Sequence, residues 1–117
     1  MAPSQIRDAT LSQLRQTYLT MTSPEWVLDL DDGSQAVQQD AAVKLLSVHH
    51  ARLVLENAEL ADIRDKLMAN EDDLETGRKA VAKALKKLEE VQAVLDAVAG
   101  FLSTVAKVLP LLGIAVA

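Results

Sequence analysis

The fold is decided by residues 46–112, which read LSVHHARLVLENAELADIRDKLMANEDDLETGRKAVAKALKKLEEVQAVLDAVAGFLSTVAKVLPLL. A leucine or valine recurs at every seventh position of this stretch: Leu46, Leu53, Leu60, Leu67, Leu74, Val81, Leu88, Leu95, Leu102 and Leu109. A second column lies three residues later: His49, Glu56, Ile63, Asn70, Gly77, Ala84, Val91, Val98, Val105 and Leu112. This spacing is the a/d heptad pattern of helices that pack in coiled coils or bundles.

The two heptad columns predict an interface between copies of the chain. A polar Asn70 in the apolar seam would fix register and the number of chains. The predicted interface residues are Leu46, Leu53, Leu60, Ile63, Leu67, Asn70, Leu74, Val81, Leu88, Val91, Leu95 and Val98.

The composition favours an all-α fold. Half of the 117 residues are apolar, only three are aromatic, and four glycines and three prolines leave little material for turns. Strands are therefore not expected. The absence of cysteine rules out disulfides and thiolate metal sites. The net charge of −5 argues against general nucleic-acid binding.

Residues 1–34 are predicted to form an N-terminal helical cap and a loop. Residues 4–21 have apolar side chains on roughly one face of a helix, and a short second helix is expected after Ser23, which precedes a proline. The loop at 31–34 ends in Ser34, a residue type that caps helix N-termini. The N-terminal helix is then expected to fold back onto the next segment.

That next segment carries a second apolar stripe beside the heptad columns. Its members are Val37, Ala41, Leu45, Val48 and Leu55. A helix with two apolar stripes needs two partners, and the N-terminal helix is the expected second one.

We predict that residues 35–109 form one long helix, with 35–96 as its coiled-coil part. The heptad phase runs through the middle of the segment without interruption, and flanking charges are complementary between parallel chains in register. The predicted interchain pairs are Glu59–Arg64, Lys66–Glu71 and Asp73–Arg78.

The alternative is an antiparallel helical hairpin that turns near Asn70. In that arrangement Asn70 caps a new helix, and the acidic residues 71–73 complement its dipole. Helices longer than about 25 residues are uncommon in globular domains, which favours the hairpin. The continuous heptad phase favours the straight helix.

The C-terminal segment 97–117 is apolar, with Lys107 as its single charge. Its length matches the ~20 residues of a membrane span, and five basic residues with no acid precede it at 78–87. Two features argue against a membrane span: the charged Lys107 lies at its centre, and Pro110 and Gly113 break the helix near its end. The residues expected in a membrane or in a bundle core are Phe101, Leu102, Val105, Lys107, Leu109 and Leu112.

No group of residues carries the signature of an enzyme, a cofactor site or a metal site. His49 and His50 are neighbours, and neighbours point about 100° apart on a helix, so they do not ligate one ion from one face. The acidic run at 71–75 lacks the spacing and the glycine of a calcium loop. A non-enzymatic protein without cofactors is expected.

The leading functional hypothesis is a self-assembling coiled-coil protein whose C-terminal helix contacts or enters a membrane as an anchor or a pore. The alternative is an adaptor or chaperone that buries this segment in a bundle or a partner. The expected partners are further copies, membrane lipid or an unknown protein. No signal peptide is visible at the start, which indicates a cytoplasmic or membrane-associated protein.

Overall fold

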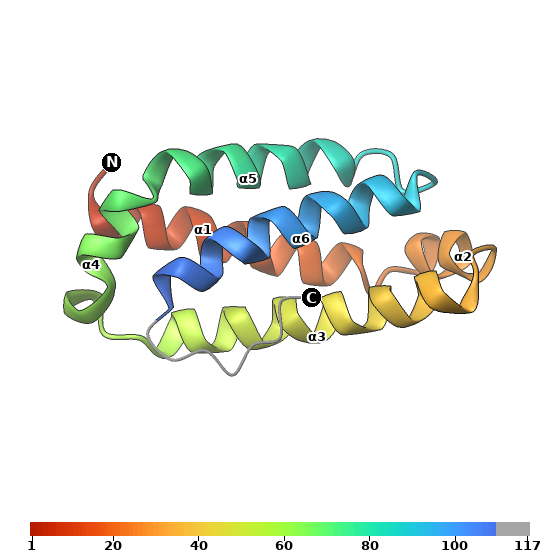
Figure 1. Cartoon of the computed structure of the whole chain (residues 1–117), viewed down its shortest axis with the longest axis horizontal. Coiled ribbons are helices and arrows are strands. Elements are labelled where there is room, and N and C mark those ends of the chain that lie inside the picture. Colours follow the sequence, from red (N-terminus) through yellow and green to blue (C-terminus); the bar gives the residue numbers. More distant parts are fainter. Residues whose placement is uncertain (110–117) are drawn as a thin grey trace.

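The computed structural model describes residues 1–109, which form six helices and no strand (Figure 1). The helices are α1 (Pro3–Thr20), α2 (Pro24–Asp31), α3 (Gln35–Asn57), α4 (Leu60–Ala69), α5 (Glu71–Ala84) and α6 (Val91–Val108). The all-α prediction is therefore confirmed for this part of the chain. Residues 110–117, which include Leu112 of the predicted core, lie outside the described residues.

Helices α2 and α3 begin where local capping chemistry predicts. The Ser23 hydroxyl accepts a hydrogen bond from the Trp26 amide at 3.3 Å and starts α2. The Ser34 hydroxyl accepts one from the Val37 amide at 3.2 Å and starts α3. Each bond satisfies one of the amides that a helix start leaves without a partner.

The prediction of one continuous helix over 35–109 is wrong. The segment is divided into α3, α4, α5 and α6 by extended backbone at Ala58 and Glu59, by Asn70, and by the turns at 85–90. The physical reason is that the leucine stripe buries itself against other helices of the same chain. Breaking the helix costs a few backbone hydrogen bonds, whereas folding the segments together buries most of the apolar surface.

The alternative hairpin at Asn70 describes part of the path. Asn70 does separate two helices, and Glu71, Asp72 and Asp73 occupy the first turn of α5. The Asn70 side chain, however, donates a hydrogen bond to the Lys66 carbonyl at 2.8 Å, and so it caps the end of α4 instead of the start of α5. The chain reverses across the whole of α4, which lies over one end of the molecule (Figure 1). A second reversal at 85–90 was not predicted.

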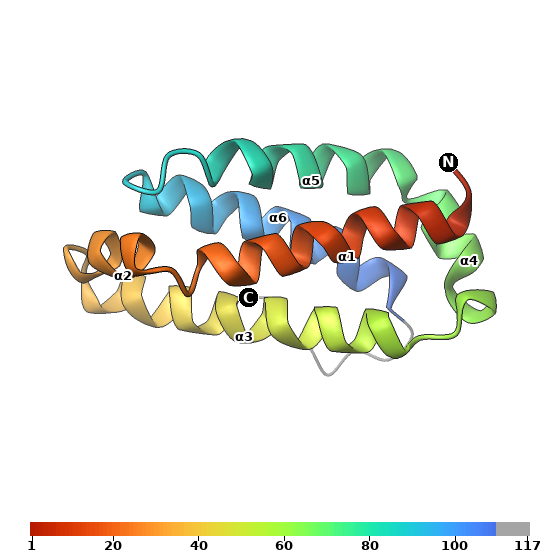
Figure 2. The ribbon, with the colours of Figure 1, turned by 180° about the vertical axis from the view of Figure 1, so that it is seen from behind.

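Four long helices form a bundle that measures 44 × 26 × 19 Å. Helices α1 and α5 run in one direction along its long axis, and α3 and α6 run in the other (Figures 1 and 2). The α5–α6 and α1–α3 pairs make the largest contacts, and the α3–α6 and α1–α5 contacts close the ring. The short helix α2 packs near the start of α3. The α1–α3 contact shows that the N-terminal helix folds back onto the next segment, as expected.

The core is filled from all six helices. Its fully buried large side chains are Leu14, Trp26, Val48, Leu55, Ile63, Leu67, Val81, Val94, Leu95, Val98, Phe101 and Leu102. From Ile63 onward the heptad stripe faces this core. On α3 the second stripe faces it instead, with Ala41, Val48 and Leu55 buried. The region boundary predicted at residue 97 falls inside α6.

Candidate functional site

Most of the predicted interface residues lie inside the chain's own bundle. Ile63, Leu67, Leu74, Val81, Leu88, Leu95 and Val98 are buried, while Leu60, Asn70 and Val91 are half-buried. Leu46 and Leu53 point outward from α3 with 69% and 39% of their surface exposed. The stripe therefore packs helices of one chain together, and an interface between chains through these residues stays a prediction.

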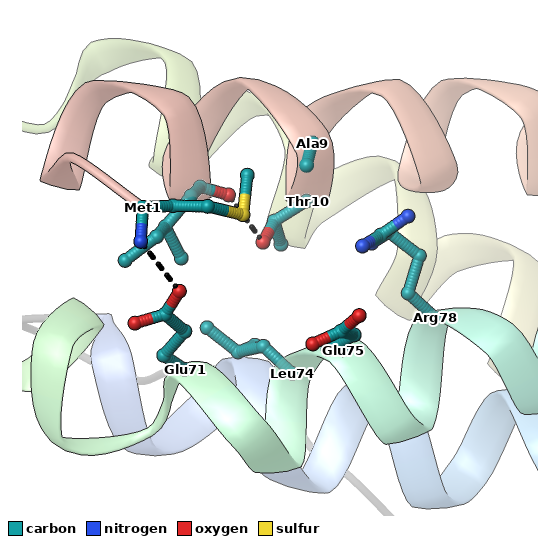
Figure 3. A pocket seen from close by; sticks show the side chains of 8 residues that line it. Met1, Ala9, Thr10, Glu71, Leu74, Glu75 and Arg78 are labelled. Atoms are coloured by element: carbon teal, nitrogen blue, oxygen red, sulfur yellow. Dashed lines mark hydrogen bonds and ion pairs between the residues drawn. The ribbon is translucent and has the colours of Figure 1, made fainter.

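The six residues of the predicted interchain ion pairs lie apart from that core. Glu59, Arg64, Lys66 and Asp73 are exposed, and Glu71 and Arg78 are half-buried between α1 and α5. Figure 3 shows Glu71 and Arg78 at a small void beside Met1 and Thr10.

Contacts inside the chain already use this corner. The Glu71 carboxylate accepts a hydrogen bond from the Met1 ammonium group at 3.0 Å (Figure 3). The void itself holds about 10 Å³, the lower limit for a single water molecule. This volume leaves room for nothing larger than one water molecule between α1 and α5.

His49 and its neighbours form a cluster that joins α1 to α3. The Tyr18 and His49 rings lie 5.2 Å apart, and the Arg52 guanidinium lies 5.5 Å from the centre of the Tyr18 ring. Beside them, Arg15 and Glu56 form an ion pair at 2.6 Å, and this hydrogen bond lowers the pKa of the Glu56 carboxyl. The cluster is a helix–helix contact, and no group of potential metal ligands occurs among residues 1–109.

Helix α6 has a buried apolar face and a solvent-exposed face. Phe101, Leu102, Val105 and Leu109 are buried in the bundle. Lys107, which was expected in the same membrane or bundle core, is exposed instead. Within residues 1–109, α6 is the one helix long and apolar enough to cross a membrane, a property that core helices of water-soluble proteins share. Seven of its residues are buried in this bundle, so its apolarity is compatible with a bundle core as well as with membrane association.

A groove open to solvent lies between α5 and α6. One part has a volume of about 460 Å³ and lies over Gly77, Ala97 and Gly100. The second part, of about 290 Å³, continues over Ala84 and Ala93 toward the loop that joins the two helices. Ala80 and Ala97 line both parts, so the two form one continuous trough, which we call the α5–α6 groove.

The floor of the groove exists because α5 and α6 pack closely at Gly77. A Cβ atom added to Gly77 would lie 3.0 Å from Cδ1 and 3.3 Å from Cα of Phe101. A side chain at this position would push Phe101 away by a few tenths of an ångström, so glycine favours this close approach. Gly100, by contrast, faces the open groove, with no atom within 4 Å of an added Cβ.

One face of α5 forms a wall of the groove from end to end. Its residues recur at intervals of three and four, which places them on one side of a helix. They are Asp73, Thr76, Gly77, Ala80, Lys83, Ala84 and Lys87, the last of these just beyond the end of α5. The middle of this face has small side chains, one end is acidic, and the other end is basic.

Reasoning from the sequence missed the groove, because Gly77 and Ala84 were counted as positions of the heptad seam and not as part of a surface of small residues. The signal that marks it is the spacing of Thr76, Gly77, Ala80 and Ala84, four small residues at three- and four-residue intervals. The chain matches no known protein family, no curated protein and no solved structure. Its function is therefore argued from the geometry of the groove.

Proposed function

We propose that the protein is a non-enzymatic helical adaptor that keeps α6 within its own bundle and binds a partner helix in the α5–α6 groove. The observation that carries the proposal is the groove itself, which is open to solvent and lined by glycine, alanine and threonine between charged side chains. Helices commonly bind in grooves between two other helices, where alternating ridges and hollows interlock.

The dimensions of the groove suit a helix. The lining residues that belong to α5 extend from Asp73 to Ala84, and eleven helical steps of 1.5 Å give a length of about 16 Å, or roughly three turns. Distances between packed helix axes fall to about 8 Å where the side chains at the contact are small. Alanine and glycine along the groove therefore allow a partner backbone to approach closely.

The rival function is self-assembly through the heptad seam with insertion of α6 into a membrane. The length and apolarity of α6 and the basic residues before it support this rival. Both steps require the buried heptad side chains to leave the bundle core. Seven residues of α6 are buried, and exposing side chains of this kind costs about 1.5–3 kcal/mol each. The adaptor requires no such opening, and for that reason we favour it.

A selection of helical peptides tests the proposed function. A displayed library of 18-residue helical peptides is selected on the full chain and then compared on two variants, Ala80→Glu and Ala82→Glu. Both alanines are exposed on α5, but only Ala80 lines the groove. We expect selected helices to lose binding to Ala80→Glu and to keep binding to Ala82→Glu.

Two outcomes contradict the adaptor function. The first is a selection in which no peptide distinguishes the two variants. The second is leakage of dye from anionic liposomes at micromolar protein concentration, combined with protection of α6 from hydrogen exchange only when lipid is present. That second outcome supports the membrane function instead.

A further inference from the structure

We propose that two copies of the chain exchange halves when the hinge at Ala58 and Glu59 straightens and joins α3 and α4 into one helix. In the exchanged dimer, residues 1–57 of each chain pack against residues 60–109 of the other. The contacts of the monomer core are kept, but those between the two halves are now made between chains. Exchange of identical elements is a low-cost route to a dimer, because only the hinge changes. The inference is independent of the groove, since α5 and α6 stay together in both forms.

The hinge is built from residues that favour a helix. Ala58 and Glu59 have extended backbone, with ψ angles of 138° and 128°, between the end of α3 and the start of α4. Alanine and glutamate are good helix formers, and the Glu59 side chain makes no capping hydrogen bond at the start of α4. Local sequence therefore favours a helix through the hinge. The packing of α4 over the end of the bundle keeps the hinge extended in the monomer (Figure 1).

The heptad stripe follows the straight form of this segment. Leu46, Leu53, Leu60 and Leu67 succeed one another at seven-residue steps, which lie along one side of a continuous helix. In the monomer the bend separates them. Leu67 is fully buried, whereas Leu46 and Leu53 are 69% and 39% exposed. A straight helix brings these leucines back into one stripe, and the second copy supplies a surface that covers the exposed pair.

The exchange keeps the closest helix pairs intact. The α1–α3 and α5–α6 pairs make the largest contacts in the bundle, and each pair stays within one chain. The contacts of α3 with α6, and of α1 with α4 and α5, pass to the other copy. A continuous helix also provides carbonyl partners for the amides at the hinge. Association costs the free motion of two chains, so we expect the dimer at high protein concentration.

Charges near the hinge oppose the approach of two copies. Glu56, Glu59 and Asp62 are exposed on its two sides, and the nearby Arg52 and Arg64 offset only part of this negative charge. Salt screens repulsion between exposed charges. Raising the salt concentration should therefore increase the fraction of exchanged dimer.

A proline at position 59 tests the hinge directly. The φ angle of Glu59 is −69°, which suits proline, and the extended backbone of Ala58 suits the residue before a proline. Glu59→Pro should therefore fold as a monomer with an equal or higher melting temperature. Inside a straightened helix the same proline breaks the backbone bonding, so the dimer association constant should fall by roughly a hundredfold or more. Glu59→Ala removes the same charge without this break and is the matched control.

The full chain is incubated at about 500 μM, a few degrees below its melting temperature, and analysed by size-exclusion chromatography and hydrogen exchange. We expect a slowly formed dimer for the wild type and for Glu59→Ala, and a monomer for Glu59→Pro. In the wild-type dimer, the amides of residues 59–61 should exchange more slowly than in the monomer, because they gain helical hydrogen bonds across the hinge.

A wild-type chain that stays monomeric under these conditions would overturn the inference. So would a dimer that Glu59→Pro forms equally well, since folded monomers would then associate without exchange. A wild-type dimer with no added protection at residues 59–61 would also overturn it, whether or not the proline variant folds. These outcomes do not bear on the groove, whose test relies on Ala80, so the adaptor function would stand.

Discussion

Replacing Gly77 by alanine tests how tightly α5 and α6 are packed beneath the groove. The added methyl group meets two atoms of Phe101, the ring carbon Cδ1 at 3.0 Å and the backbone Cα at 3.3 Å. Phe101 is only 1% exposed, so its ring lacks room to turn away, and the helices must separate by a few tenths of an ångström. Overpacking of this kind costs about 1–3 kcal/mol, against about 1 kcal/mol gained in helix propensity. We expect a net loss of about 1 kcal/mol.

Gly100→Ala is the matched control for this change. It lies on α6 with nothing within 4 Å of the new Cβ, so only the propensity gain of about 1 kcal/mol remains. The two variants should therefore differ by about 2 kcal/mol in the free energy of unfolding. Urea denaturation followed by circular dichroism at low micromolar concentration measures this difference without a contribution from association. Our description of the α5–α6 contact is refuted if Gly77→Ala is as stable as Gly100→Ala.

Three further changes test the core, a cap and an ion pair. Leu55→Ala, at a side chain that is 0% exposed, should lower the free energy of unfolding by about 2–5 kcal/mol in urea denaturation. Leu46→Ala, on the outer face of α3, should change it by less than about 0.5 kcal/mol. Equal effects would mean that α3 is rotated differently. Ser34→Ala removes the cap of α3 and should cost about 1 kcal/mol by the same method, and an unchanged stability would argue against that capping bond. The bond from Arg15 lowers the pKa of Glu56 below its usual 4.5, so its stabilisation is present above pH 4.5 and is lost as the pH falls through the lower folded pKa. Acid titration of Glu56→Gln should accordingly show a shallower loss of stability below pH 4.5 than the wild type, and identical curves would count against the pair.

Local chemistry let the sequence determine where α2 and α3 begin. A capping serine acts on an amide three residues away, so Ser23 and Ser34 identify the starts of α2 and α3 without knowledge of the rest of the chain. The helical class follows equally from composition. The periodic leucines also show which face is buried from Ile63 to Leu109. An apolar stripe must be covered by another helix, whichever chain that helix belongs to.

Only the tertiary structure decided what covers that stripe. A heptad reads the same whether the facing helix belongs to another chain or to the same one, and the breaks at Ala58 and at 85–90 contain neither proline nor glycine to announce them. On α3, two apolar stripes competed, and the positions of α1 and α6 buried the one with Val48 while leaving Leu46 in water. The α5–α6 groove has the same origin. Small residues indicate that another helix can come close. Whether they meet a neighbour, as Gly77 meets Phe101, or open space, as Gly100 does, depends on how α5 and α6 pack against each other.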